Sequence, residues 1–90
     1  MSRTELREAS ELLATANQGV EDSALTERIE GLANQLETLA EASRGPDQGR
    51  IDRIENALTE IEAELDGDAR ERVREAHEKL REYRATVGGI

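Results

Sequence analysis

The sequence contains no cysteine and almost no aromatic residues or lysine. The lack of cysteine excludes a disulfide framework, thiolate chemistry and a cysteine-based zinc site, and it fits a reducing compartment. No apolar run approaches the roughly 20 residues that span a bilayer, and residues 1–5 lead directly into a charged segment rather than into a signal-peptide core. These absences predict a cytoplasmic protein.

Negative charge is abundant instead. The chain has 21 acidic residues against 12 basic ones, which gives a net charge of -9, and Lys79 is its single lysine beside the arginines. This balance suits a protein in molar salt, where repulsion between carboxylates is screened over about 3 Å instead of about 10 Å at 0.1 M. An ordinary acidic helical protein from a genome rich in arginine codons would look similar, and we favour adaptation to salt.

The spacing of large apolar side chains predicts the fold. Ninety residues suffice for one domain, residues 1–90. Apolar residues recur at alternating steps of three and four, which is the heptad pattern of helices that pack at a shallow angle. Pro46 and its neighbouring glycines break the middle of the pattern and force the chain to reverse. The predicted helices cover roughly residues 3–18, 23–43, 47–65 and 69–87.

Reversing the chain at each of the three links brings the apolar stripes into register. Asp22 or Ser23 is expected to cap the second helix, and Gly67 to take the left-handed conformation that ends the third. The result is an all-α, antiparallel up-down-up-down four-helix bundle with coiled-coil-like packing. Alanines predict a close approach of the first and last helices, and the middle two form the thicker half. The five predicted layers are Val20/Leu25/Leu65/Ala69, Ala16/Ile29/Ile61/Val73, Leu13/Leu32/Leu58/Ala76, Ala9/Leu36/Ile54/Leu80 and Leu6/Leu39/Ile51/Tyr83.

The last predicted helix carries a row of basic residues along one flank of its apolar stripe. Residues 1–66 have a net charge of -10, whereas residues 67–90 have a net charge of +1. One interpretation is a contact surface for an anionic partner such as nucleic acid. The basic stripe consists of Arg70, Arg74, His77, Arg81 and Arg84.

A second interpretation of the basic stripe is pairing with the preceding helix. Reversal at the link places Arg70 opposite Glu62, His77 opposite Glu55, and Arg72 near Glu64, which are positions for ion pairs between helices. Nucleic-acid binding usually requires a basic domain or stacking aromatics, and this chain has neither. We favour the pairing and regard nucleic acid as the less favoured partner.

No pattern in the sequence predicts catalysis, a cofactor, a metal or a small-molecule substrate. His77 is the single histidine, and Arg74 occupies the position that glutamate would take in a di-iron bundle motif. Glu60, Glu62 and Glu64 are spread around their helix rather than gathered into one site. Since continuous apolar seams leave no cleft in which a pKa could be tuned, we expect no polar pocket and no enzymatic activity.

A bundle of this size gains stability from a partner chain. Candidate contacts for a homodimer or another helical protein are Leu12, Ile90 and the alanine flank of Ala33 and Ala40. The sequence thus predicts a non-enzymatic structural or interaction module, with a polyanion-binding regulator as the alternative.

Three stretches, residues Ser2–Leu13, Arg44–Arg50 and Arg81–Val87, resemble a family of small haloarchaeal proteins of unknown function. The resemblance extends over the whole chain. It implies a cytosolic protein in high salt, and it supplies no activity, ligand or site residue.

Overall fold

The computed structural model describes residues 4–41 and 48–87, and its side chains at positions 4–41 and 49–85. These residues form four helices: α1 (Thr4–Asn17), α2 (Ser23–Glu41), α3 (Gln48–Glu64) and α4 (Gly67–Val87). Ser2, the turn around Pro46, the side chain of Val87 and Ile90 lie outside these ranges, and so do the predictions made for them. Among the described residues, no helix is long and apolar enough to cross a membrane.

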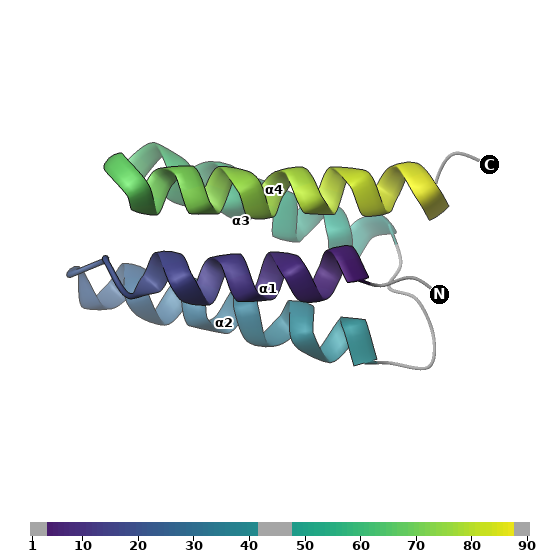
Figure 1. Ribbon diagram of the computed structural model, residues 1–90, viewed down its shortest axis with the longest axis horizontal. Coiled ribbons are helices and arrows are strands. Elements are labelled where there is room, and N and C mark those ends of the chain that lie inside the picture. The colour runs from purple at the N-terminus through teal and green to yellow at the C-terminus, as the bar shows by residue number, and fades with distance from the viewer. Residues whose placement is uncertain (1–3, 42–47, 88–90) are drawn as a thin grey trace.

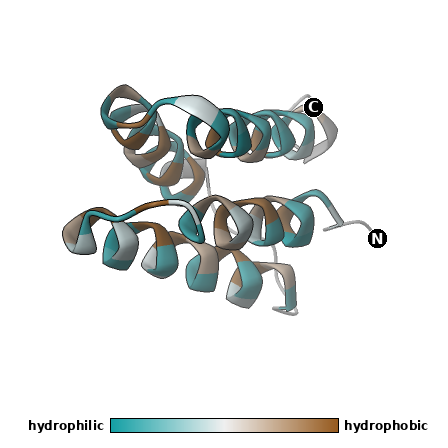
Figure 2. Cartoon of the chain, turned by 60° about the vertical axis from the view of Figure 1, so that its left-hand side comes forward, coloured by the Kyte–Doolittle hydropathy of each residue, from teal (hydrophilic) through white to brown (hydrophobic). Residues whose placement is uncertain are grey.

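Successive helices run in opposite directions (Figure 1). The predicted all-α four-helix bundle is thereby confirmed, and its longest dimension is 39 Å. In Figure 1, α1 and α2 form one layer and α3 and α4 lie above them. Hydrophobic positions of the helices face the space between these layers, and hydrophilic positions face outward (Figure 2).

Four of the five predicted core layers are fully buried. Each takes one residue from every helix, and Leu6, Leu36 and Leu58 are among the side chains with no exposed surface. Sixteen of the 17 buried apolar residues belong to these layers, and Ala33 is the other one. The fifth layer, Val20/Leu25/Leu65/Ala69, is only half-buried because it lies at the end of the bundle, beside the links from α1 to α2 and from α3 to α4.

The four helices do not pack equally closely. The backbones of α1 and α4 approach each other along most of their length, and α1 also packs closely on α2, whereas α2 and α3 stay further apart. Ala9 and Ala76 explain the first contact because alanine allows a short distance between helix axes. Buried Ser10 supports the second by donating a 2.8 Å hydrogen bond to the carbonyl oxygen of Ala33. Leucine and isoleucine layers separate α2 from α3.

The helix ends follow the sequence where the structure describes them. The side chain of Asp22 accepts a hydrogen bond from the backbone N–H of Leu25, so Asp22 is the cap of α2. Asn17 joins the same link by donating to the carbonyl oxygen of Thr26. Gly67 has a φ of 62°, which confirms the predicted left-handed conformation. However, α4 begins at Gly67 rather than near Ala69, because the carbonyl oxygen of Asp66 already accepts the N–H of Arg70.

Two glycines make a matched pair for a stability test. Gly31→Ala is expected to raise the free energy of unfolding by up to about 1 kcal/mol, since alanine is the better helix former and a Cβ at this exposed position meets nothing within 4 Å. Gly67→Ala is expected to lower it by about 1–2 kcal/mol, because the positive φ strains any residue with a Cβ. Urea unfolding followed by circular dichroism measures both. Changes of the same sign would contradict this interpretation.

Candidate functional site

The predicted basic stripe lies along the side of α4 that faces α3, but its members differ in exposure. His77 is buried at 6% relative exposure, and Arg84 is half-buried. Arg70, Arg74 and Arg81 are exposed. The stripe is therefore divided into residues that pack on α3 and residues that remain at the surface.

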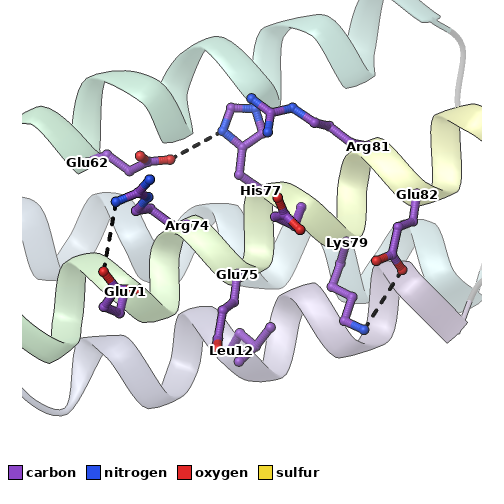
Figure 3. A pocket seen from close by; sticks show the side chains of 10 residues that line it. Leu12, Glu62, Glu71, Arg74, Glu75, His77, Lys79, Arg81 and Glu82 are labelled. Atoms are coloured by element: carbon purple, nitrogen blue, oxygen red, sulfur yellow. Dashed lines mark hydrogen bonds and ion pairs between the residues drawn. The ribbon is translucent and has the colours of Figure 1, made fainter.

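His77 is the centre of the contact between α3 and α4. Its Nε2 atom lies 3.7 Å from Oε1 of Glu55, which confirms the predicted pair. Its Nδ1 atom lies 3.3 Å from Oε2 of Glu62 (Figure 3). The side chains of the two glutamates are 17% and 20% exposed, so all three groups are largely removed from water. Each ring nitrogen thus faces a carboxylate of α3.

Arg84 adds a further group of contacts nearer the N-terminal end of α3. Its guanidinium Nη1 atom lies 2.7 Å from a carboxylate oxygen of Asp52 and 3.4 Å from Oε2 of Glu55. Glu55 therefore lies between His77 and Arg84. We call His77, Glu55, Glu62, Arg84 and Asp52 the α3–α4 charge cluster.

Two of the predicted ion pairs are wrong. Glu62 pairs with His77 rather than with Arg70. Arg72 lies 3.4 Å from Glu75 on its own helix rather than near Glu64. Both arginines are exposed, and Arg72 is nearer to a carboxylate one turn away than to a side chain across the seam.

The exposed part of the basic stripe makes few contacts. Arg74 lies 3.8 Å from Glu71, one turn earlier on α4. Within the described ranges, neither Arg70 nor Arg81 forms an ion pair. Three arginine side chains, Arg70, Arg74 and Arg81, are thus available to solvent along α4.

Ion pairs also join the other neighbouring helices. Arg7 of α1 pairs with Glu41 of α2, and Arg28 of α2 pairs with Glu60 of α3. Between α4 and α1, Lys79 Nζ lies 3.2 Å from Oε1 of Glu8. Every seam between adjacent helices thus has at least one ion pair. Each pair contributes about 0–1 kcal/mol at exposed positions. Together the pairs favour this arrangement of the four helices over arrangements that would bring other flanks together.

Lys79 was not among the predicted site residues, although the predicted core layers place it near Glu8. Ala9 and Leu80 share a layer, and their sequence neighbours Glu8 and Lys79 lie on either side of this layer in the α1–α4 seam, close enough for long side chains to meet. The hydrogen bond and the charge of Glu8 raise the pKa of Lys79 above its usual 10.5, and the charge of Glu82 adds to this. Because this pKa is raised on folding, the pair stabilises the folded chain fully below pH 10.5 and loses its effect as the pH rises through the folded value.

We expect Glu8→Gln to lower the pKa of Lys79 toward its usual value. Since the chain has one lysine, its side-chain resonances are assigned without ambiguity, and NMR titration between about pH 9 and 12 gives this pKa directly. Glu11→Gln is the matched control, because Glu11 forms no ion pair within the described part of the chain. An equal pKa in the native protein and the Glu8→Gln variant would refute the assignment.

The expectation of no polar pocket is wrong. A hollow lined mainly by charged side chains lies over the outer side of α4 and reaches Leu12 of α1 and Glu62 of α3 (Figure 3). It is open to solvent, and the ion pairs of Arg74 with Glu71 and Lys79 with Glu82 lie along it. Within the described ranges, no three histidine or acidic side chains are grouped so that they could hold a metal ion.

Comparison with known proteins gives a family but no activity. Neither the curated proteins nor the solved structures contain a match to this chain. The profile of one family, described as a family of unknown function (DUF7553), matches residues 1–86. With nearly the whole chain matched, this four-helix protein belongs to the family of unknown function DUF7553.

Proposed function

We propose that this chain is a non-enzymatic structural or protein-interaction module adapted to high salt. The observation that carries the proposal is the closed core. Four layers receive a side chain from every helix, so the large apolar residues are used within the chain. What the described residues offer to other molecules is the outer faces of rigid helices.

The hollows support the same view. The hollow over α4 is open, and several of the side chains that line it already pair with their neighbours. A second, between α2 and α3, has Leu32 and Ile54 at its base and arginines at its rim. An enclosed site that excludes water and shifts a pKa is the usual setting for catalysis, and these open hollows favour contact with another surface instead.

The alanine flank that was proposed as a partner contact is occupied by the chain itself. Ala33 is buried, and its carbonyl oxygen accepts the hydrogen bond of Ser10. Ala40 is half-buried against the core. Leu12 is also half-buried, but it borders two hollows and remains a candidate contact.

The proposal includes adaptation to salt and a cytoplasmic location, in keeping with the resemblance to haloarchaeal proteins. Carboxylates such as Glu11, Glu30 and Glu78 are exposed without ion pairs in the described part of the chain. At 0.1 M salt, carboxylates repel others within about 10 Å, the Debye length, which is half the width of the bundle. In molar salt this repulsion is largely removed.

We therefore expect the melting temperature to rise as KCl increases from about 0.1 M to several molar. Each 1 kcal/mol of repulsion that is relieved should raise it by roughly 4–8 °C in a domain of this size. Circular dichroism measures the transition. Changing Glu11, Glu30 and Glu78 to glutamine should make the curve less dependent on salt, whereas Ser10→Ala should shift it equally at every concentration. A melting temperature that does not respond to KCl would remove the salt adaptation from the proposal.

The interaction itself is tested by complex formation at the salt concentration where the chain is most stable. The full chain should form a complex of fixed stoichiometry, with itself or with a protein identified by cross-linking, that can be rebuilt from purified components. Substitutions on one exposed helix face should abolish the complex and leave the circular dichroism spectrum unchanged. A chain that remains a monomer and binds no purified candidate would refute the interaction role.

The alternative is a regulator that binds a polyanion through Arg70, Arg74 and Arg81. Their exposure favours it. The use of His77 and Arg84 within the α3–α4 charge cluster weighs against it, because two of the five members of the stripe face carboxylates. A gel-shift experiment in molar KCl separates the two functions: tight binding of nucleic acid that is lost on charge reversal at Arg74 and Arg81 would establish the alternative.

A further inference from the structure

The surface along the loosely packed α2–α3 seam differs from the rest of the molecule in how its charged residues are distributed. Its α2 row holds one charged residue, and its α3 row is ordered by charge. All these residues are exposed except Ala57, which is half-buried. We call this surface the α2–α3 face. It consists of Ala24, Arg28, Gly31, Gln35 and Thr38 on α2 and of Arg50, Arg53, Ala57, Glu60 and Glu64 on α3.

The charges on α3 change sign along the helix. Arg50 and Arg53 occupy the first half, Ala57 the middle, and Glu60 and Glu64 the last half. Steps of three and four keep all five on one flank of the helix, since residues at that spacing lie above one another. Such a row is complementary to itself when a second copy runs in the opposite direction. Each basic half then meets an acidic half.

We propose that the α2–α3 face binds a second copy of this chain, with the two α3 helices antiparallel about a two-fold axis near Ala57. This rests on the proposed interaction function and names its partner. An isologous contact of this kind uses the same surface on both copies. The axis places Arg50 of each copy opposite Glu64 of the other, and Arg53 near Glu60, which also pairs with Arg28 of its own chain.

The groove between the two helices fits this arrangement. The hollow there is lined by Leu32, Ile54 and Ala57 at its base and by Arg50 and Arg53 at its rim. Gly31 leaves open space, because a Cβ built on it meets no atom within 4 Å. Small residues at Gly31 and Ala57 let a second pair of helices approach closely. The same rotation keeps Arg28, the one charged residue of the α2 row, away from Arg28 of the other copy, so no like charges meet there.

The outer side of α4 lacks these properties. Charges of both signs alternate along it, and its acidic residues Glu71, Glu75 and Glu82 are held by Arg74, Arg72 and Lys79. The size of the α2–α3 side is also sufficient. A bundle of 39 × 20 × 19 Å offers a side comparable with the roughly 800 Å² that each partner contributes to a standard interface.

The charge order provides a test by exchange. Arg50→Glu places like charges opposite Glu64 of a second copy, and the two-fold axis makes that clash occur twice. Glu64→Arg does the same with the opposite sign. Each variant alone should weaken the dimer at least about tenfold. An equal mixture of the two should recover it, because the introduced glutamate of one chain then faces the introduced arginine of the other, and the symmetry-related contact is the native pair of Arg50 with Glu64.

Sedimentation equilibrium of the full chain measures the dissociation constants, in the lowest KCl concentration at which circular dichroism shows the native helix content for all variants. Arg81→Glu is the matched control, because it changes the net charge by the same amount as Arg50→Glu at an exposed position of α4, outside the α2–α3 face, and should leave the dimer intact. A native chain that is monomeric at millimolar concentration would overturn the proposal, as would a dimer indifferent to Arg50→Glu or a mixture that does not recover. If the chain is monomeric but binds a different purified protein, the proposed function stands and the second copy is excluded.

Discussion

Leu58→Ala is expected to lower the free energy of unfolding by about 2–5 kcal/mol. Leu58 has no exposed surface, and it lies in the same fully buried layer as Leu13, Leu32 and Ala76. Truncation removes apolar contacts and leaves a cavity that rigid neighbouring helices fill only in part. Since domains of this size are stable by only about 0.05–0.15 kcal/mol per residue, a loss in the middle of the expected range removes about a third of the total stability. Urea unfolding in molar KCl measures the loss.

The control for Leu58→Ala is Leu12→Ala. Leu12 is the same residue type on a neighbouring helix, but it is half-buried at the outer edge of the α1–α4 seam. Its truncation should cost about 1 kcal/mol or less, because part of its surface is already in contact with water. Similar losses at the two positions would show that the layers do not carry the stability of the bundle.

The core was predictable because two regularities in the sequence agree. Heptad spacing places Leu32, Leu36 and Leu39 on one stripe of α2, and the links of the chain fall midway between matching residues of adjacent helices. Together these fix which side chains share a level. The exposure of the end layer was less predictable, because a helix pattern does not show how much apolar surface a short link such as Leu65–Asp66 covers.

The partners of the charged residues were less predictable. Reversal at a link gives the level of a side chain along the bundle but not the direction in which it reaches. Ala76 shares a layer with Leu58, so the adjacent His77 lies at a level between Glu55 and Glu62, and it contacts both. Arg70 was predicted to pair with Glu62 only because reversal at the link places the two residues at a similar height along the bundle. Its long side chain instead extends into solvent near the first turn of α4.

The handedness of the bundle was also not predictable from the apolar pattern. Two mirror-related arrangements of an up-down-up-down bundle have the same neighbours and the same layers, so apolar spacing does not choose between them. Charged flanks do distinguish them, because each arrangement places different residues in a seam. Glu8 with Lys79 and Glu55 with His77 are the pairs that fit the observed arrangement. Charge complementarity of the exposed flank of α3 with a second copy is likewise the basis of the proposed dimer.

His77→Leu tests how much the α3–α4 charge cluster contributes. The substitution leaves Glu55 and Glu62 beside an apolar side chain in a largely dry seam. A charged group that loses its buried partner costs about 3–5 kcal/mol, and the partial exposure of both carboxylates reduces the expected loss to about 1–3 kcal/mol. Glu62→Leu alone should cost less, because His77 keeps Glu55 as a neighbour.

The double variant, with leucine at both positions, distinguishes an interaction from simple packing. It removes the unpaired carboxylate at position 62, while Glu55 retains Arg84 at 3.4 Å. We therefore expect the double variant to be more stable than the sum of the single losses predicts, by about 0.5–3 kcal/mol in a double-mutant cycle. Unfolding at neutral pH in molar KCl gives all four free energies. Losses that add to within about 0.5 kcal/mol would show that His77 is held by its apolar surroundings alone, and the cluster would then have no part in selecting α3 as the neighbour of α4.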